Sequence, residues 1–327
     1  MRGLASALAL LALLGAAAAG CGSEGEAEPV ADETIPAVDP TTATTLSAAS
    51  SAPVVVGADG VESTITDVSR IVTLSGDLTE FVFELGLGDA VVATDITTVE
   101  PPEAEALPKV GVGRFLNAEA VLSYEPTLVL ADTQTSPPTS IEQIRSAGVP
   151  VVVFDVPTTF DALYDKIGQI GVVLGAPAAA EALTARIAGE IDAALDSAAR
   201  VSPSPRVAYL YTRGPDVMLL FGEGMTTTAL IRGAGGIDAG ADIGIEGTID
   251  VTPEALVTAQ PDVIIVNTEG LAAFGGRDGF VGSPGVAQTP AGLAGRILDY
   301  PEGDFLTFGP RVAASLAALI ADLSAIG

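Results

Sequence analysis

Two spacings of apolar positions alternate along the chain, and each spacing predicts one kind of element. Short runs of β-branched and other apolar residues predict buried strands, and apolar positions three or four residues apart predict helices that cover them. The runs cover residues 70–74, 90–93, 149–154, 206–211, 217–221, 263–266 and 296–298, and residues 109–115 are interpreted as a short strand followed by a glycine-rich bend. Because helical stretches separate many of these runs, the pattern predicts an α/β protein in which crossover helices connect parallel strands.

One unit of helix followed by strand occurs twice, in residues 116–131 and again in residues 251–267. In each copy an acid in the first turn and a short apolar run predict a helix, which a proline ends before a β-branched strand. Such a unit cannot bury both of its faces alone, so the repeat predicts two similar α/β lobes. The paired positions are Glu119 with Glu254, Ala120 with Ala255 and Pro126 with Pro261, at a constant offset of 135 residues.

A long helical pattern lies between the two copies, over residues 159–199, with one break at 175–177. Its second part carries an apolar stripe with a spacing of four, at Leu183, Ile187, Ile191 and Leu195. We interpret this part as one long, stiff helix that joins the lobes. The alternative is an ordinary crossover helix inside one lobe, with the lobes joined elsewhere. A glycine-rich loop is expected over residues 270–285.

The N-terminal residues have the pattern of a secretion signal. One charge, Arg2, precedes an apolar run over residues 4–19, and small residues come directly before Cys21, the only cysteine. The run is too short for a membrane span, which needs about 20 residues. The site resembles the lipobox of bacterial lipoproteins, and this implies that Cys21 carries a lipid that anchors the protein outside the cytoplasm. The alternative is an ordinary signal cleavage with Cys21 incidental.

The segment after Cys21 is rich in small residues, prolines and acids without a helical or strand period, which predicts a flexible tether. Val54, Val55 and Val56 are a weaker candidate for an early strand. The predicted segments are a signal peptide (1–20), a lipidated tether (21–67), an N-terminal α/β lobe (68–157), a helical segment with the inter-lobe helix (158–200) and a C-terminal α/β lobe (201–327).

Composition excludes several classes of function. Acidic residues outnumber Lys and Arg by 42 to 14, for a net charge of −28, so binding to nucleic acid or to an anionic membrane surface is disfavoured. The absence of histidine excludes Ser-His-Asp chemistry and histidine-based zinc sites. With one cysteine no intramolecular disulfide can form. We find no paired-carboxylate or nucleophile motif with a base nearby, so an enzyme is disfavoured, and we expect the protein to be a monomer.

Several short blocks resemble the metal-chelate substrate-binding proteins of ABC importers, which capture siderophores, cobalamin and haem. These blocks are RIVTLSGDLTE (70–80), LPKVG (107–111), NAEAV (117–121), GVPVVV (148–153) and PEAL (253–256). Three further blocks are similar to the haemin-binding lipoproteins (HmuT type) of Gram-positive actinobacteria, namely YTRG (211–214), GVAQTPAG (285–292) and FGPR (308–311).

The resemblance implies the class III periplasmic-binding-protein fold, with two Rossmann-like lobes, one rigid helix between them and the ligand in the cleft. Haem b (haemin) would be the transported ligand and not a catalytic cofactor, and a ferric siderophore or cobalamin is the alternative cargo. The partners would be the permease subunits with their ATPase. Glu119 and Glu254 would dock onto basic residues of the permease, a role that charge complementarity permits. The alternative is that each is only a first-turn acid favoured by the helix dipole.

Tyr211 and Arg213 are the predicted centre of the haem site. Tyr211 lies at the end of a predicted strand, where open α/β sheets place ligand groups, and Arg213 has the same strand parity. A nearby cation stabilises a phenolate on ferric iron. The resemblance implies that Tyr211 is the axial ligand and Arg213 its support. The alternative is a core tyrosine beside a turn arginine.

The first lobe departs from the family pattern. Members often carry a second axial ligand, a histidine or tyrosine, at one of two places where this chain has Gly113-Arg114-Phe115 and Val99-Glu100-Pro101. Arg114, like Arg213, is a candidate for contact with a propionate, and Phe115 for covering the ring. Either the iron is five-coordinate, or Met225 or another tyrosine such as Tyr209 reaches it, or the ligand is not haem.

Overall fold

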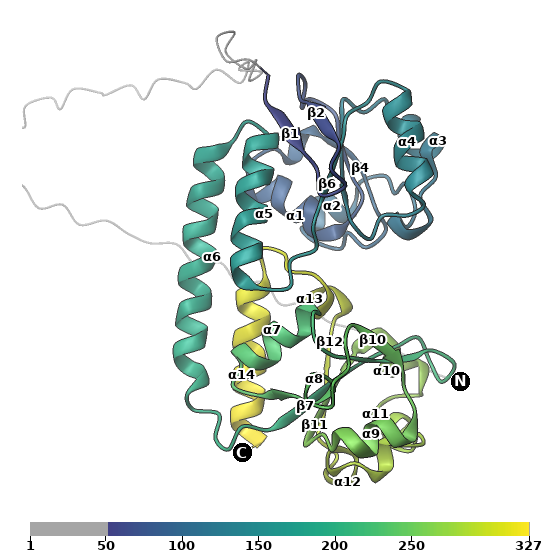
Figure 1. Cartoon of the computed structure of the whole chain (residues 1–327), viewed down its shortest axis with the longest axis vertical. Coiled ribbons are helices and arrows are strands. Elements are labelled where there is room, and N and C mark those ends of the chain that lie inside the picture. Colours follow the sequence, from purple (N-terminus) through teal and green to yellow (C-terminus); the bar gives the residue numbers. More distant parts are fainter. Residues whose placement is uncertain (1–51, 327) are drawn as a thin grey trace, which may run out of the picture. The chain divides into compact units, whose positions relative to one another are not determined.

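The computed structural model describes residues 52–326. The predicted signal peptide, Cys21 and the predicted tether up to residue 51 lie outside the described residues. Two separate sheets, each with its own helices, account for the described residues, together with one small hairpin (Figure 1). Among residues 52–326, no helix combines the length and the hydropathy that crossing a membrane requires.

The first sheet has four parallel strands in the order β4-β3-β5-β6. Every residue of β5 and β6 is buried, because helices cover both faces of the sheet. The strands are β3 (Ile71–Thr73), β4 (Val91–Thr94), β5 (Leu128–Asp132) and β6 (Val151–Phe154). The helices are α1 (Gly76–Glu84), η1 (Gly88–Ala90), α2 (Pro102–Glu105), η2 (Gly113–Phe115), α3 (Ala118–Leu122) and α4 (Pro138–Ser146). We call this sheet with these helices the first lobe.

The second sheet is mixed, in the order β10-β8-β7-β11-β12, with β9 also paired to β7. Strands β7, β11 and β12 are parallel, whereas β8 and β10 are antiparallel to their neighbours. The strands are β7 (Arg206–Thr212), β8 (Met218–Phe221), β9 (Ile237–Asp238), β10 (Thr248–Asp250), β11 (Val263–Asn267) and β12 (Ile297–Tyr300). The helices are α7 (Thr226–Gly233), α8 (Ala239–Asp242), α9 (Pro253–Ala259), α10 (Thr268–Ala273), α11 (Arg277–Val281), η3 (Val286–Gln288), α12 (Pro290–Ala294), α13 (Glu302–Leu306) and α14 (Val312–Ile326). These form the second lobe, so the predicted α/β class with two lobes is confirmed.

The repeated unit appears in the structure as α3 with β5 and as α9 with β11. A polar side chain caps each helix: Asn117 accepts from the backbone N–H of Glu119, and Thr252 accepts from that of Ala255. Helix α9 ends at Gln260, which has a left-handed backbone (φ 46°), and the left-handed Glu125 (φ 49°) follows two residues after the C-cap of α3, Ser123. Among the described residues these are the two non-glycine positions with positive φ, and they stand at the same offset as the sequence repeat. The two units therefore share a backbone conformation as well as a sequence pattern.

The predicted helical segment consists of α5 (Phe160–Val173) and the 22-residue α6 (Pro177–Ala198). Helix α6 packs against both α5 and α14, as Figure 1 shows. Its buried face includes Leu183, Ile187 and Ile191, which join a core that contains residues from both sheets. The long helix predicted between the lobes is thereby confirmed.

The structure corrects the end of the predicted tether. Strands β1 (Val54–Val56) and β2 (Glu62–Thr64) form an antiparallel hairpin. The hairpin is fixed to the first lobe, because the Ala58 N–H donates to the carbonyl of Val153 and Arg145 pairs with Asp59 at 2.7 Å. A flexible tether as far as residue 67 is therefore wrong over this hairpin. The weaker candidate for an early strand, Val54 to Val56, is β1, whereas its partner β2 was not predicted because three residues are too few to show a period.

Two glycine-rich stretches also differ from their predictions. Residues 109–115 contain a single bridge, from Lys109 to Thr94, in place of the predicted short strand, and the η2 turn lies at the predicted glycine-rich bend. Residues 270–285 include α11 and part of α10, where a loop was expected. Gly270 serves close packing, since a Cβ there would lie 2.3 Å from the carbonyl oxygen of Thr212.

Candidate ligand-binding site

The carboxyl ends of β7, β11 and β12 meet at one edge of the second sheet. In the strand register Leu210 lies opposite Val266, and Asn267 lies opposite Tyr300. Tyr211 follows Leu210 and therefore stands at this edge. Ligands of open α/β sheets bind outside the carboxyl ends of the strands. The edge is therefore the candidate site in the second lobe.

The side chains of Tyr211 and Arg213 contact each other at this edge. The Arg213 Nε–H donates to the Tyr211 phenol oxygen at 2.5 Å, and the guanidinium carbon lies 5.4 Å from the ring centroid. Arg213 Nη2 also contacts Glu302, at 3.0 Å to Oε1 and 2.8 Å to Oε2. The parity argument correctly placed Tyr211 and Arg213 on one side. Glu302 was missed, because it is 89 residues away in the sequence and lies in a block that carries no motif.

Hydrogen bonds fix the backbone between Tyr211 and Arg213. The Thr212 N–H donates to Asn267 Oδ1 at 2.9 Å, and Asn267 Nδ2 donates to the Thr212 carbonyl at 3.1 Å. The Arg213 N–H donates to the carbonyl of Val217, and Gly214 takes φ +108°, which favours glycine. Asn267, fully buried at the end of β11, is a second residue that sequence reasoning missed. The turn is thus held at a defined position beside β11.

Burial and nearby charges together set the pKa of Glu302. Burial raises the pKa of Glu302, the positive charge of Arg213 opposes this, and the negative charge of Glu269 adds to it. The positive charge of Arg114, from the first lobe, also lowers the pKa of Glu302. Arg114 therefore lies close enough to the edge of the second sheet for its charge to act there. For Arg213, burial acts to lower the pKa, but the hydrogen bond with Tyr211 and the charge of Glu302 outweigh it and raise the pKa. Arg213 remains a cation.

The first lobe presents the η2 turn, which carries Arg114 and Phe115. Asp95 accepts from the Gly113 N–H at 2.6 Å and so fixes the turn to the end of β4. A Cβ on Gly113 would lie 2.6 Å from the carbonyl oxygen of Leu74, so only glycine fits. Phe115 is 84% exposed, and Arg114 donates to Gln134 at 2.6 Å. An exposed aromatic ring of this size is a surface that a ligand can cover.

Two of the lesser candidates pack away from solvent. Tyr209 is 1% exposed and its ring lies 5.9 Å from that of Phe305, so the prediction that it lines a cleft is wrong. Burial raises the pKa of Tyr209 far above its ordinary value, and its phenol stays neutral. Strand parity placed Tyr209 on the correct face but could not show the depth of its burial. Met225 is half-buried against the main core, as is Tyr211.

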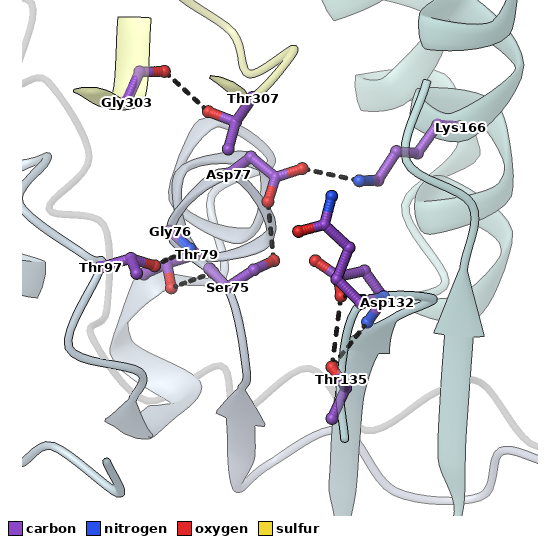
Figure 2. A network of polar contacts seen from close by, with 11 residues as sticks. Ser75, Gly76, Asp77, Thr79, Thr97, Asp132, Thr135, Lys166, Gly303 and Thr307 are labelled. Carbon is purple, nitrogen blue, oxygen red and sulfur yellow. Dashed lines mark hydrogen bonds and ion pairs between the residues drawn. The ribbon is translucent and has the colours of Figure 1, made fainter. Parts of the chain in front are cut away.

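A buried polar network lies at the carboxyl ends of β3 and β5 (Figure 2). Asp77 and Lys166 pair at 2.6 Å with 5% and 4% of their side chains exposed, and Ser75 donates to Asp77 at 2.6 Å. Burial acts to raise the pKa of Asp77, but the charge and hydrogen bond of Lys166 outweigh it and lower the pKa. Burial raises the pKa of nearby Asp132, and the charge of Asp77 adds to this. The pair ties α1 to α5. The sequence block 70–80 contains Asp77, but nothing in the sequence indicated Lys166 as its partner.

The two lobes also meet through Arg311, which precedes α14. Its Nε and Nη2 donate to the two carboxylate oxygens of Glu80 at 3.0 and 3.1 Å, and its Nη1 donates to Asp304 at 2.9 Å. Burial raises the pKa of Glu80, and the hydrogen bond and charge of Arg311 oppose this rise. The segment between α13 and α14 therefore packs on α1 of the first lobe.

Comparison with known proteins identifies the family. The model of the periplasmic binding protein family matches residues 71–303, more than two thirds of the 327-residue chain. The chain belongs to this family. It is 32% identical over 208 residues to a cobalamin-binding protein of Halobacterium salinarum, a match that spans 61% of this chain and 54% of that protein. The match thus spans about half the length of that curated relative.

Solved structures of haem-binding proteins have the same fold. The periplasmic haem-binding protein RhuT from Roseiflexus sp. RS-1, in its apo form, is 41% identical, with a TM-score of 0.77 over 80% of this chain and 99% of that one. The haem-binding protein HmuT is 33% identical, with a TM-score of 0.79 over 86% of this chain and 93% of that one. The resemblance to haemin-binding proteins within a wider family that includes cobalamin binders is confirmed, and so is the class III fold.

Proposed function

We propose that the protein is the substrate-binding lipoprotein of an ABC importer, that it captures haem between its lobes, and that it delivers haem to the membrane permease. The observation that carries this proposal is the Tyr211–Arg213 pair at the carboxyl end of β7, where a half-buried phenol accepts a hydrogen bond of 2.5 Å from a cation. The names of the solved relatives RhuT and HmuT support haem as the cargo.

The phenol oxygen of Tyr211 is a suitable ligand for ferric iron. Binding requires the phenol to lose its proton, and the Arg213 N–H then donates to the phenolate that remains. This hydrogen bond is charge-assisted and is stronger than one between neutral groups. Arg213 also pairs with Glu302, so we assign Arg213 to the support of Tyr211 rather than to the propionates.

The first lobe supplies the opposite side of the haem site. The exposed ring of Phe115 would cover part of the porphyrin, and Arg114 would exchange its contact with Gln134 for a charge-assisted bond to a propionate. We assign no sixth ligand, because Tyr209 lies in the core and Met225 packs against it.

Glu119 and Glu254 are the proposed contacts with the permease. Both are exposed in the first turn of their helices, α3 and α9, and the two repeated units have matching N-terminal caps and a left-handed residue at the same offset. Two equivalent carboxylates, one on each lobe, would meet two basic sites of the permease and fix the register of docking. We further propose that the protein acts as a monomer.

The membrane anchor is proposed from the sequence around Cys21, where small residues precede the only cysteine. A lipid on Cys21 would hold the protein at the outer face of the cell membrane, with the segment before β1 as the tether. Cys21→Ala should release the protein into the medium or leave its signal peptide uncut, and mass spectrometry of the membrane-extracted N-terminal peptide tests for the lipid. An unmodified Cys21 in membrane-bound protein would contradict the anchor.

A corrinoid is the second candidate cargo, because the Halobacterium relative is a cobalamin-binding protein. Titration of the purified protein with haemin and, separately, with cyanocobalamin distinguishes the two. We expect a saturable Soret band with haemin that Tyr211→Phe abolishes, since this variant removes only the phenol oxygen. Tyr124→Phe is the matched control, because Tyr124 follows α3 and packs against the core of the first lobe, not at the edge of the second sheet. Saturable binding of cyanocobalamin alone would overturn the haem assignment.

A further inference from the structure

Glu302 is held where it can act on Arg213. It is the first residue of α13 and follows β12 by two positions, so it stands at the same sheet edge as Tyr211. Its side chain is 27% exposed, whereas that of Arg213 is 53% exposed. The carboxylate of Glu302 is therefore the more firmly embedded partner of the pair.

The guanidinium of Arg213 is bound on two sides. Its Nε–H donates to Tyr211 at 2.5 Å, and its Nη2 lies 3.0 and 2.8 Å from the two oxygens of Glu302. A planar guanidinium held at two of its edges keeps one orientation, whereas a long, half-exposed arginine without the second contact samples many rotamers. Contact with Glu302 thus limits where the Nε–H can point.

We propose that Glu302 is a positioning residue of the haem site, which holds Arg213 so that its Nε–H stays aimed at the Tyr211 phenol oxygen. The inference rests on the proposed function. When Tyr211 binds ferric iron its proton leaves to solvent, and the charge of Arg213 is then shared between the phenolate and Glu302.

If Glu302 acted only through its negative charge, removing it would strengthen the binding of the Tyr211 phenolate to iron. A negative charge beside Tyr211 repels a phenolate, and Glu302 lies near enough to the neutral Tyr211 phenol for a hydrogen bond from it to lower the pKa of Glu302. Arg213 contacts both groups, and its charge-assisted hydrogen bond to the phenolate outweighs repulsion by a partly solvated carboxylate whose charge Arg213 also neutralises. Loss of Glu302 should therefore weaken ligation, although it removes a negative charge.

Three substitutions of Glu302 distinguish the effect of its side-chain length from the effect of its charge. Glu302→Ala removes the contact, Glu302→Gln keeps the reach without the charge, and Glu302→Asp keeps the charge with a side chain one methylene shorter. Positioning predicts that Asp is more harmful than Gln, whereas a role of charge alone predicts the reverse. Glu269→Gln is the matched control, because Glu269 is exposed and its charge acts on Arg213, but no hydrogen bond between them is present among the described residues.

The measurements are the rate of haemin loss to apomyoglobin and the phenolate-to-iron charge-transfer absorption of the ferric complex. We expect Glu302→Ala to speed haemin loss about tenfold and to weaken the absorption, a coupling of ordinary size for residues in one network. In an Arg213→Ala background the same change should add no further effect. Thermal unfolding shows whether Glu302→Ala destabilises the fold. If it does, the comparison of Glu302→Gln with Glu302→Asp decides between a positioning role and a role of charge.

The outcomes distinguish this inference from the proposed function. If the wild type has no haemin absorption that depends on Tyr211, the proposed function is wrong. If Tyr211→Phe and Arg213→Ala act as expected but Glu302→Ala leaves both measurements unchanged, the positioning role is wrong. An effect of Glu302→Ala that persists in full without Arg213 would also contradict it, since Glu302 would then act on haem or on the fold directly.

Discussion

Replacement of Lys166 with methionine tests the role of the buried pair with Asp77. The change keeps the length of the side chain but leaves the Asp77 carboxylate, 5% exposed, without its cation. Breaking a buried pair from one side costs about 3 to 5 kcal/mol. Protonation limits this cost, because protonating a carboxyl of ordinary pKa 3.8 at pH 7 costs about 4 kcal/mol. Both arguments predict a loss of about 3 to 4 kcal/mol in the free energy of unfolding.

Urea unfolding of the wild type and of Lys166→Met measures this loss. Arg186→Met is the matched control, because Arg186 pairs with Glu84 at a similar 2.8 Å but with 43% and 45% of the side chains exposed. An exposed pair contributes about 0 to 1 kcal/mol. The double variant Asp77→Asn with Lys166→Met should recover part of the loss, because it leaves no unpaired buried charge.

The pH dependence of this difference has a defined sign. The pKa of Asp77 is lowered in the folded protein, so the pair stabilises the fold above the ordinary pKa of 3.8 and this contribution is lost as the pH falls through the lower folded value. In Lys166→Met a low pH instead neutralises the unpaired carboxylate. The difference between wild type and variant should therefore shrink already as the pH falls from 7 towards the ordinary pKa of 3.8, and shrink further as the wild type loses its own pair below that value. A loss no larger than that of Arg186→Met would refute the reasoning.

Three further predictions concern other parts of the molecule. Burial raises the pKa of Asp132, so this carboxyl lowers the stability of the wild type as the pH rises from 3.8 to the raised folded pKa. Asp132→Asn should therefore raise the free energy of unfolding at neutral pH and remove this pH-dependent fall. Urea unfolding over a pH series tests this, and lower stability at pH 7 would contradict it. Gly270→Ala should cost about 1 to 3 kcal/mol and weaken haemin binding, because its Cβ would lie 2.3 Å from the Thr212 carbonyl; equilibrium unfolding and haemin titration test this, and unchanged binding would contradict it. Glu119→Lys combined with Glu254→Lys should abolish haem uptake by cells and leave haemin affinity unchanged, and uptake at the wild-type rate would contradict permease docking.

Local sequence patterns were enough to predict the main layers of the fold. The repeat at Glu119 and Glu254 predicted two lobes, because an equal offset at several positions requires two similar units, and the matching left-handed residues Glu125 and Gln260 share that offset. The apolar stripe of α6 predicted the long helix, because a spacing of four over many residues fits only a helix.

Contacts that depend on strand order could not be predicted. Glu302 meets Arg213 only because β12 lies beside β11 and β11 lies beside β7. The Asp77–Lys166 pair likewise depends on α5 packing over α1, at a separation of 89 residues. Strand parity gave the facing of Tyr209 but not the aromatic rings that bury it. Each miss concerns a tertiary contact for which the sequence carries no periodic signal.

Absorbance titration of the purified protein with haemin, beside its Tyr211→Phe and Tyr124→Phe variants, is the most direct test of the central claim. A phenol oxygen at the end of β7 that binds ferric iron predicts a saturable Soret band in the wild type and in Tyr124→Phe, and its loss in Tyr211→Phe. The same band in all three proteins would contradict the claim.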